Sequence, residues 1–204
     1  MVDTLILPGL NGSPPGHWQA HWAAEQPGAR MLIQEDWACP RLEDWLARLE
    51  DALSGLDAVW LVAHSLGAIL AANLADRLSA AKVKGALLVA PSDLDHVEAL
   101  HPCIVRFGTM PTRRLPFPSV VVASRNDPYM PFDAARHYAQ LWGSDLADLG
   151  HVGHINIASG FGRWSQGQAL LDRLRASFRP PRPAISVPLG VIQSQSSPRS
   201  RLGS

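Results

Sequence analysis

Cysteine is scarce in this chain of 204 residues and occurs only as Cys39 and Cys103. Two cysteines do not build the disulfide framework that stabilises many small secreted domains. Neither cysteine lies beside a histidine at a strand-to-helix junction. We therefore expect small buried or half-buried thiols and no thiol catalysis.

Charge of one sign is not in excess either. The 18 basic residues balance the 18 acidic ones, and the formal net charge is zero. Such a balance does not build the basic field of non-specific nucleic-acid binding or a polybasic membrane patch. We expect neither nucleic acid nor a membrane among the partners of this protein.

Long apolar runs are missing as well. No stretch approaches the roughly 18 apolar residues of a membrane-spanning helix. The N-terminus, MVDTLILPGLNG, has an acidic residue where a secretory signal has Lys or Arg, and its apolar run is short. The expectation is a soluble, cytoplasmic protein, with a monomer as the default oligomeric state.

Hydrophobic residues make up 47% of the chain, which is enough for one sizeable core. The composition changes after Phe178, where the chain becomes rich in Pro, Ser and Arg and loses its periodicity. We predict one domain over residues 1–178 and a Pro/Ser/Arg-rich, disordered tail over residues 179–204.

Short apolar runs alternate with stretches of helical periodicity along the predicted domain. Strands are predicted within residues 4–9, 29–35, 57–63, 83–93, 118–128 and 144–150, and helices within residues 16–26, 40–56, 67–80, 132–144 and 167–178. This alternation predicts an α/β fold with a mostly parallel sheet and helices on both faces. Functional residues of such folds gather at the carboxyl ends of the strands.

The stretch VWLVAHSLGAIL, residues 59–70, places Ser65 between an apolar strand and a helix rich in small residues. At such a tight turn the serine hydroxyl projects from the chain, and the helix N-terminus beside it stabilises an oxyanion. The turn requires small residues two positions before and after the serine, and Ala63 and Gly67 are small. We predict that Ser65 is the nucleophile of a hydrolase; a plain helix cap is the alternative.

A nucleophilic serine needs a base to take its proton and a carboxylate to orient that base. In hydrolases of this architecture the chain order is Ser, then Asp or Glu, then His. Asp127 follows a predicted strand and has the place of the acid, although a plain Asn-Asp-Pro turn also accounts for it. Asp133 falls inside the next predicted helix, where it is interpreted as an N-terminal helix charge.

Histidines are more numerous than the chemistry needs. His151 and His154 both follow the last predicted strand in the Gly-rich segment LGHVGHINIASG, and spacing alone does not choose between them. His64, beside the serine, is interpreted as a structural residue that points away. His17 and His21 lie four apart on a helix, but no third metal ligand has suitable spacing, so we interpret them as surface or interface histidines.

Acyl transfer also needs two backbone N–H donors for the oxyanion. The N–H of Leu66, directly after the serine, is the first predicted donor. The loop PGLNGS, residues 8–13, follows the first strand and supplies the second donor from Leu10. The side chain of Leu10 does not enter the chemistry, so it can be apolar.

Several segments together resemble a known family, the small single-domain α/β-hydrolases related to retinoblastoma-binding protein nine, also called YdeN-like serine hydrolases. The resemblance covers residues 4–178 and is carried by PGLNGS, HWQAHW, VAHSLG, APSD, LPFPSVVVASRNDPY, LWGS and GHINIASGFGRW. Ala63 departs from the general G-x-S-x-G signature, but this family accepts small residues there. The L-x-C-x-E motif of retinoblastoma binding is absent, so that partner is not implied.

The resemblance implies a compact α/β-hydrolase fold that holds no metal and no organic cofactor. It implies that Ser65 is the nucleophile, Asp127 the acid and His154 the base, because the base of the family lies in a G-H-I-N segment, here residues 153–156. His151 occupies a position where the family needs no histidine.

The expected activity is hydrolysis of small esters, with thioesters and amides as further substrates, through an acyl-enzyme. One alternative is a binding protein that keeps the fold without catalysis, with Trp18, Trp22 and Trp37 on a recognition surface. Another is an acyltransferase with the same triad. The short connection between APSD and LPFPS leaves no room for a large lid, so we expect a small-molecule acyl substrate.

Overall fold

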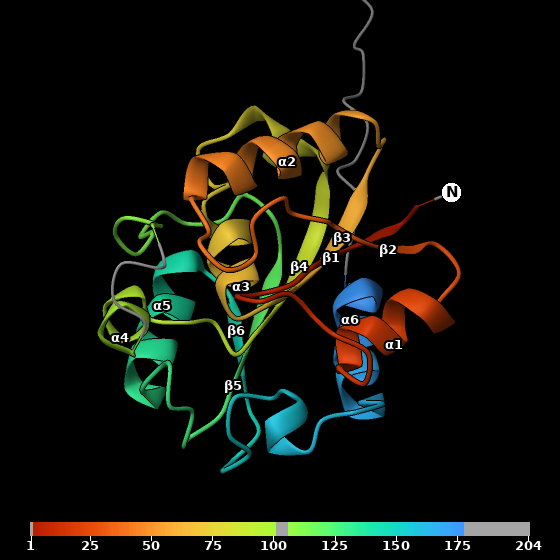
Figure 1. Ribbon diagram of the computed structural model, residues 1–204. Coiled ribbons are helices and arrows are strands. Elements are labelled where there is room, and N and C mark those ends of the chain that lie inside the picture. Colours follow the sequence, from red (N-terminus) through yellow and green to blue (C-terminus); the bar gives the residue numbers. More distant parts are fainter. Residues whose placement is uncertain (1, 101–105, 178–204) are drawn as a thin grey trace, which may run out of the picture.

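Six strands form one parallel sheet in the part of the chain that the structure describes (Figure 1). This computed structural model describes residues 2–100 and 106–177, without the side chains of residues 98–100. The order across the sheet is β2-β1-β3-β4-β5-β6. The strands are β1 Thr4–Leu7, β2 Ala29–Met31, β3 Val59–His64, β4 Val83–Val89, β5 Ser119–Ala123 and β6 Asp145–Asp148. Each lies at a predicted strand segment, and the predicted α/β fold is confirmed.

The central strands are apolar because both of their faces are covered. Every residue of β1 and β3 is buried, and in β4 only Lys84 is partly exposed. Leu7 at the end of β1 pairs with Ala63, and His64 at the end of β3 pairs with Val89. The carboxyl ends of these strands therefore meet at one edge of the sheet, where the following loops gather.

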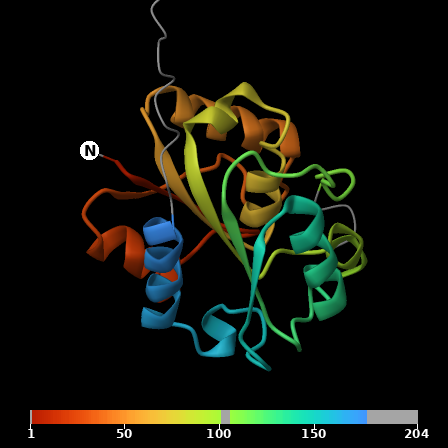
Figure 2. The same ribbon diagram turned by 180° about the vertical axis from the view of Figure 1, so that it is seen from behind.

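Helices pack on both faces of the sheet (Figures 1 and 2). They are α1 Trp18–Glu25, α2 Leu42–Ser54, α3 Leu66–Ala72, α4 Leu94–Leu100, α5 Phe132–Trp142 and α6 Ser165–Ser177, with 3₁₀ helices η1 Leu78–Lys82 and η2 Ile157–Ser159. One core cluster includes Trp45 and Trp142 and joins α2, α3 and α5 to the sheet. A second includes Trp18, Trp22 and Trp164 and joins α1 and α6 to the opposite face.

The helix α2 shows how the apolar pattern decides burial. Its residues Trp45, Leu46, Leu49 and Leu53 are buried, and Leu42 packs half-buried against the same core. Positions three and four apart share one stripe of an α-helix, and this stripe faces α3 and the sheet. The outward positions of α2 carry charge instead, as in its first turn.

The helix after Ser65 is shorter than predicted. The pattern of residues 67–80 predicts one helix, but α3 ends at Ala72 and the separate helix η1 begins at Leu78. At Asn73 both the backbone N–H and the side-chain amide donate to the carbonyl of Ile69. A side chain that competes for backbone acceptors favours a turn over further helix.

The loops contain two further differences from the predictions. α4, Leu94–Leu100, was not predicted, and it lies in the connection between β4 and β5. Cys39 is exposed, so the expectation of a buried thiol is wrong for it. The carboxylate of Asp36 accepts from the N–H groups of Ala38 and Cys39, and this turn holds the thiol at the surface. Cys103 and the predicted tail lie outside the described residues.

No helix in residues 2–100 and 106–177 is long and apolar enough to cross a membrane.

Candidate active site

Ser65 occupies the turn between β3 and α3 in a backbone conformation that L-residues rarely adopt. Its φ and ψ are 57° and −124°, and its side chain makes no capping hydrogen bond to α3. Its N–H donates to the carbonyl of Val89 at 3.0 Å, which ties the turn to the end of β4. Such a conformation costs about 1–3 kcal/mol and persists where the surroundings enforce it. The alternative that Ser65 is a plain helix cap is therefore wrong.

Two glycines let this turn lie against β1 and the loop after it. A Cβ at Gly67 would lie 2.2 Å from the carbonyl oxygen of Leu7, and one at Gly9 would lie 2.6 Å from the Cβ of Ser65. No side chain fits at such distances in a close-packed interior. Glycine is thus required at position 67 because this residue lies against the backbone of β1. Gly9 likewise lies close to Ser65, which the sequence motif had not indicated.

Ser65, His154 and Asp127 are connected by hydrogen bonds. The Oγ of Ser65 lies 3.0 Å from Nε2 of His154, whose Nδ1 lies 2.9 Å from both carboxylate oxygens of Asp127. A carboxylate only accepts, so Nδ1 of His154 carries the proton, and in the neutral imidazole Nε2 accepts from the Ser65 hydroxyl. The side chain of Asp127 is 2% exposed and that of His154 is 7% exposed. An imidazole that contacts a carboxylate thus lies within hydrogen-bond reach of a hydroxyl, which is the arrangement that nucleophilic catalysis by serine requires.

The other candidates for acid and base lie apart from this chain of hydrogen bonds. His151 is exposed. Asp133 lies exposed in the first turn of α5, where it pairs with Arg136. Asp127 also forms the predicted turn, because its Oδ1 accepts from the N–H of Tyr129 at 2.9 Å. The turn and the contact with the imidazole exist together at this residue.

The loops that carry Asp127 and His154 are fastened to each other by Asn126 and Ser124. The Oδ1 of Asn126 accepts from the N–H of Gly153 at 2.8 Å and from the hydroxyl of Ser124 at 2.9 Å. The Oγ of Ser124 in turn accepts from the N–H of Val152 at 3.1 Å. These bonds fix the separation of the carboxylate and the imidazole.

The backbone directly after His154 is strained, and two buried donors hold it. Ile155 has a φ of 52°, which is rare for a β-branched residue. The indole N–H of Trp18 donates to the carbonyl of Ile155, and Nε2–H of His64 donates to the carbonyl of His154, both at 2.9 Å. Buried carbonyls require such partners. Residues of α1 and β3 therefore hold the loop in the conformation that aims the imidazole at Ser65.

Two histidines lie differently from the predictions. His64 is buried with its ring centroid 4.8 Å from that of His154, so it does not point away from the site. His17 is 4% exposed and its ring centroid lies 5.0 Å from that of His64, so it is not a surface histidine. His17 is the N-cap of α1, and its Nδ1 accepts from the N–H of Gln19. It is buried because α1 begins next to the carboxyl ends of the strands. His21 remains half-buried.

Burial changes the pKa values of both histidines. Desolvation lowers the pKa of His17 from 6.5 to about 4, and the nearby charge of His154 adds to this effect. Desolvation also lowers the pKa of His64 well below 6.5, with charge on His154 and His17 acting in the same direction. Both rings are therefore neutral near pH 7. Within the described ranges, no three His, Cys, Asp or Glu residues form a group that would hold a metal ion.

Ser92 belongs to this site, although the sequence analysis did not identify it. It is 1% exposed, and its Oγ lies 2.7 Å from the Oγ of Ser65. It follows β4 within the segment APSD, and β4 is the neighbour of β3 in the sheet. Knowledge of this strand order would have indicated the contact, because the ends of neighbouring parallel strands meet.

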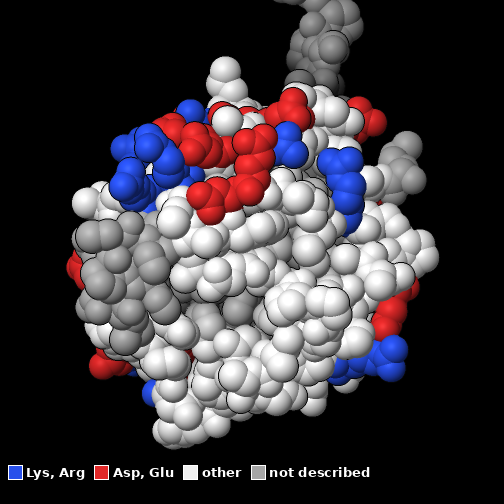
Figure 3. Space-filling view, viewed as in Figure 1, with Lys and Arg blue, Asp and Glu red and all other residues white. Residues whose placement is uncertain are grey.

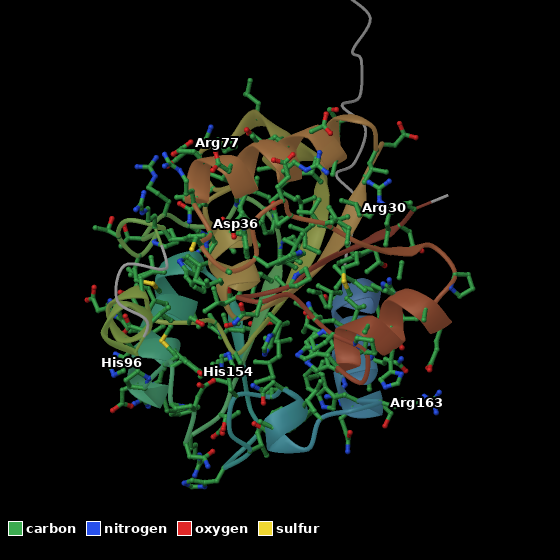
Figure 4. All side chains as sticks on the ribbon, viewed as in Figure 1. Arg30, Asp36, Arg77, His96, His154 and Arg163 are labelled. Carbon is green, nitrogen blue, oxygen red and sulfur yellow. The ribbon has the colours of Figure 1, made fainter. Side chains whose placement is uncertain are left out.

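A cavity of about 390 Å³ opens beside Ser65. Leu10 and Leu66, the two predicted oxyanion donors, line it together with Val97, Tyr129 and Ile157. Figure 3 shows a hollow in the middle of the face seen in Figure 1, and the described residues around it are mostly drawn white, as neither acidic nor Lys or Arg. In Figure 4, His154 lies in the interior of this view, whereas the labelled arginines lie near its edges.

Known proteins resemble this chain over most of its length. A YdeN-like protein of Pectobacterium atrosepticum is 30% identical, with a TM-score of 0.74 and with 88% of this chain and 94% of that chain covered. YdeN of Bacillus subtilis is 26% identical over 169 residues, which make up 78% of this chain and 88% of that protein. An esterase of Thermogutta terrifontis, 16% identical with a TM-score of 0.62, covers 89% of this chain and 86% of its own, and shows the fold alone.

The family model for serine hydrolases matches residues 4–173. This range includes all six strands of the described sheet and the loops that carry Ser65, Asp127 and His154. The predicted resemblance to the YdeN-like hydrolases is confirmed by these comparisons. The chain belongs to the serine hydrolase family.

Proposed function

We propose that this enzyme hydrolyses small carboxylic esters through an acyl-enzyme, with Ser65 as nucleophile, His154 as base and Asp127 as the orienting acid. The observation that carries the proposal is the buried chain of hydrogen bonds from Ser65 through His154 to Asp127, with separations of 3.0 and 2.9 Å. It stands at a strained turn beside an open cavity. Thioesters and amides are further candidate substrates, because they carry the same electrophilic carbonyl.

In the first half of the reaction, Nε2 of His154 takes the hydroxyl proton of Ser65 as Oγ attacks the carbonyl carbon. The tetrahedral intermediate collapses when the bond to the leaving alcohol breaks, and the same proton passes from His154 to that alcohol. Asp127 keeps the imidazole in the required tautomer and stabilises its charged form. The product of this half is an ester on Ser65.

In the second half, a water molecule gives a proton to His154 and attacks the acyl carbon. The bond from that carbon to Oγ breaks, Ser65 regains its proton from His154, and the carboxylic acid leaves. The same residues thus act twice, as the symmetry of acyl transfer requires.

The oxyanion of both intermediates needs backbone donors. Leu66 is the first residue of α3, and the first N–H groups of a helix have no acceptor within the helix. Leu10 follows Gly9, which lies so close to Ser65 that a Cβ there would be 2.6 Å from the Cβ of Ser65. Both residues line the cavity, which supports their N–H groups as the oxyanion donors.

Among the alternatives, a binding protein without catalysis has less support. Two of the tryptophans considered for a recognition surface, Trp18 and Trp22, are at most 1% exposed and pack in the core. A binding function also does not require an aligned base and carboxylate at a strained serine. Acyl transfer to an acceptor other than water uses the same residues and stays an alternative.

A fluorophosphonate probe and a p-nitrophenyl butyrate assay test the proposal. Butyrate is a suitable acyl group because the Thermogutta esterase, which shares the fold, binds it. We expect the probe to label Ser65, and we expect Ser65→Ala and His154→Ala to lower kcat by several orders of magnitude while the far-UV spectrum is kept. His151→Ala is the matched control and keeps its activity. Absence of labelling in the folded wild-type protein contradicts the proposal.

A further inference from the structure

The cavity beside Ser65 is lined by residues that, within the described part of the chain, are neither acidic nor basic apart from histidine. Among the described residues that line it there is no Asp, Glu, Lys or Arg. Its polar groups are neutral, and include the amides of Asn11 and Asn156 and the hydroxyl of Tyr129. Apolar walls come from Leu10, Val97 and Ile157.

Two of the three histidines in these walls, His17 and His64, do not supply charge either. His17 and His64 are both buried, and burial lowers the pKa of His17 to about 4 and that of His64 well below 6.5. The carboxylate of Asp127 is directed at Nδ1 of His154 and is 2% exposed. A charged group on a bound substrate would therefore lose water without gaining a partner of opposite charge, which is costly.

We infer that the acyl group accepted by this cavity carries no negative charge, and that the enzyme discriminates against acyl chains that end in a carboxylate. The inference rests on the proposed function, because it assigns the cavity to the acyl part of the ester. It names the substrate class as esters whose acyl chain carries no carboxylate and is small enough for a volume of about 390 Å³.

A matched pair of esters tests this inference. The p-nitrophenyl monoester of adipic acid carries a carboxylate at the end of its acyl chain, and its methyl ester is neutral with almost the same shape. We expect kcat/KM for the methyl ester to exceed that for the carboxylate by about 100-fold, after correction for the rates with hydroxide. A difference below about tenfold overturns the inference. If neither ester is hydrolysed and Ser65 is not labelled, it is the proposed function that fails.

A variant that places a positive charge in the cavity wall provides a second test of the inference. Ile157 lines the cavity and is 45% exposed, so a longer side chain is accommodated there. We expect Ile157→Lys to raise the ratio of carboxylate to methyl-ester activity by about tenfold over Ile157→Met, the neutral control of similar length. An identical ratio in the two folded variants overturns the assignment of the acyl chain to this cavity.

A second inference comes from the hydroxyl of Ser92, which is independent of the cavity walls. The hydroxyl of Ser65 gives its proton to Nε2 of His154, because Nδ1 of that ring already donates to Asp127. The Oγ of Ser65 is therefore the acceptor in its 2.7 Å contact with Ser92, and Ser92 is the donor. One lone pair of Ser65 is then occupied and the other is free for attack.

We propose that Ser92 is a positioning residue that orients the attacking oxygen of Ser65. Its hydrogen bond also favours the step in which the bond from the acyl carbon to Oγ breaks, because negative charge develops on that oxygen. Ser92 is 1% exposed, so water does not readily replace this donor.

The variant Ser92→Ala tests this role, with Ser92→Thr as the variant that keeps the hydroxyl. We expect Ser92→Ala to lower kcat for p-nitrophenyl butyrate and the rate of fluorophosphonate labelling by about tenfold each, with KM unchanged. Ser92→Thr restores part of both rates. Unchanged kcat in folded Ser92→Ala overturns the role, and so does a raised KM at constant kcat. The labelling rate decides the matter if the threonine variant does not fold.

Discussion

At the scale of single residues, backbone geometry and side-chain size decide whether the site can form. Ser65 carries a side chain in a region of φ and ψ that favours glycine, and Gly9 and Gly67 have no side chain where any Cβ would collide. The turn thus stores strain at Ser65 and excludes side chains from the positions around it.

The strain at Ser65 is measurable as stability. We expect Ser65→Gly to have a free energy of unfolding about 1 kcal/mol higher than Ser65→Ala, because glycine adopts a positive φ without steric cost. Both variants lack the hydroxyl, so they differ in the backbone and one methyl group. Urea denaturation followed by fluorescence measures the difference. Equal or reversed stabilities would show that the turn is not strained.

Replacement of Gly67 by alanine is expected to destabilise the protein, which is the opposite of the usual effect in a helix. Alanine normally stabilises a helix relative to glycine by about 1 kcal/mol. In Gly67→Ala the new Cβ would meet the Leu7 carbonyl at 2.2 Å, so we expect a loss of about 1–3 kcal/mol in the free energy of unfolding. Gly162→Ala, at a position with open space around it, is the control and changes stability little. A stabilised Gly67→Ala protein would contradict this account.

At the scale of elements, the site depends on loops that other elements hold in place. The loop after β6 carries His154, but its carbonyls are held by Trp18 of α1 and by His64 of β3. Asn126, in the loop after β5, fastens the same loop from the other side. The orientation of the His154 imidazole therefore depends on α1, β3 and the loop after β5, which are distant from one another in the sequence.

The indole of Trp18 allows a matched comparison. Trp18→Phe removes the donor to the Ile155 carbonyl, and we expect kcat to fall about fivefold to tenfold because the imidazole is aimed less well. Trp22→Phe is the control, since Trp22 is equally buried and its indole N–H has no hydrogen-bond partner among the described residues. Steady-state kinetics of both variants measure the effect. Equal losses in both would indicate that packing alone matters.

At the scale of the whole molecule, two cores enclose the sheet, and neutral histidines lie where the second core meets the strand ends. His17 and His64 stay uncharged in the folded protein, whereas in the unfolded chain each titrates with the ordinary pKa of 6.5. Between pH 6.5 and about 4 the unfolded state therefore binds more protons than the folded state. Stability is fully present above pH 6.5 and is lost as the pH falls through this window.

We expect the free energy of unfolding to fall by up to ~3 kcal/mol from His17 alone between pH 6.5 and 4. The variant His17→Asn keeps an acceptor for the helix cap and removes the titrating ring, so its stability should decline less steeply. Denaturation midpoints across this pH range measure both slopes, and parallel slopes would contradict the burial of a neutral His17.

Residue patterns alone were sufficient for the α/β fold, because parallel strands buried on both faces must be apolar throughout. Residues 59–63 of β3 and 85–89 of β4 meet this requirement, and so both segments were predicted as strands. The candidate nucleophile was also predictable, since a serine between an apolar strand and a helix of small residues has few other uses. The choice of His154 over His151 required the family resemblance, because two histidines three residues apart on a Gly-rich loop have equivalent spacing.

What the sequence determined by itself is therefore the alternation of strands with helices along the chain and the elbow at Ser65, both of which depend on local patterns of size and hydrophobicity. Only the tertiary structure decided that His17 and His64 are buried, that Ser92 reaches Ser65, and that no Asp, Glu, Lys or Arg among the described residues lines the cavity. These features depend on which strand ends become neighbours and on what α1 covers. Side chains that are far apart in the sequence come into contact at the strand ends, and a local sequence pattern does not predict such contacts.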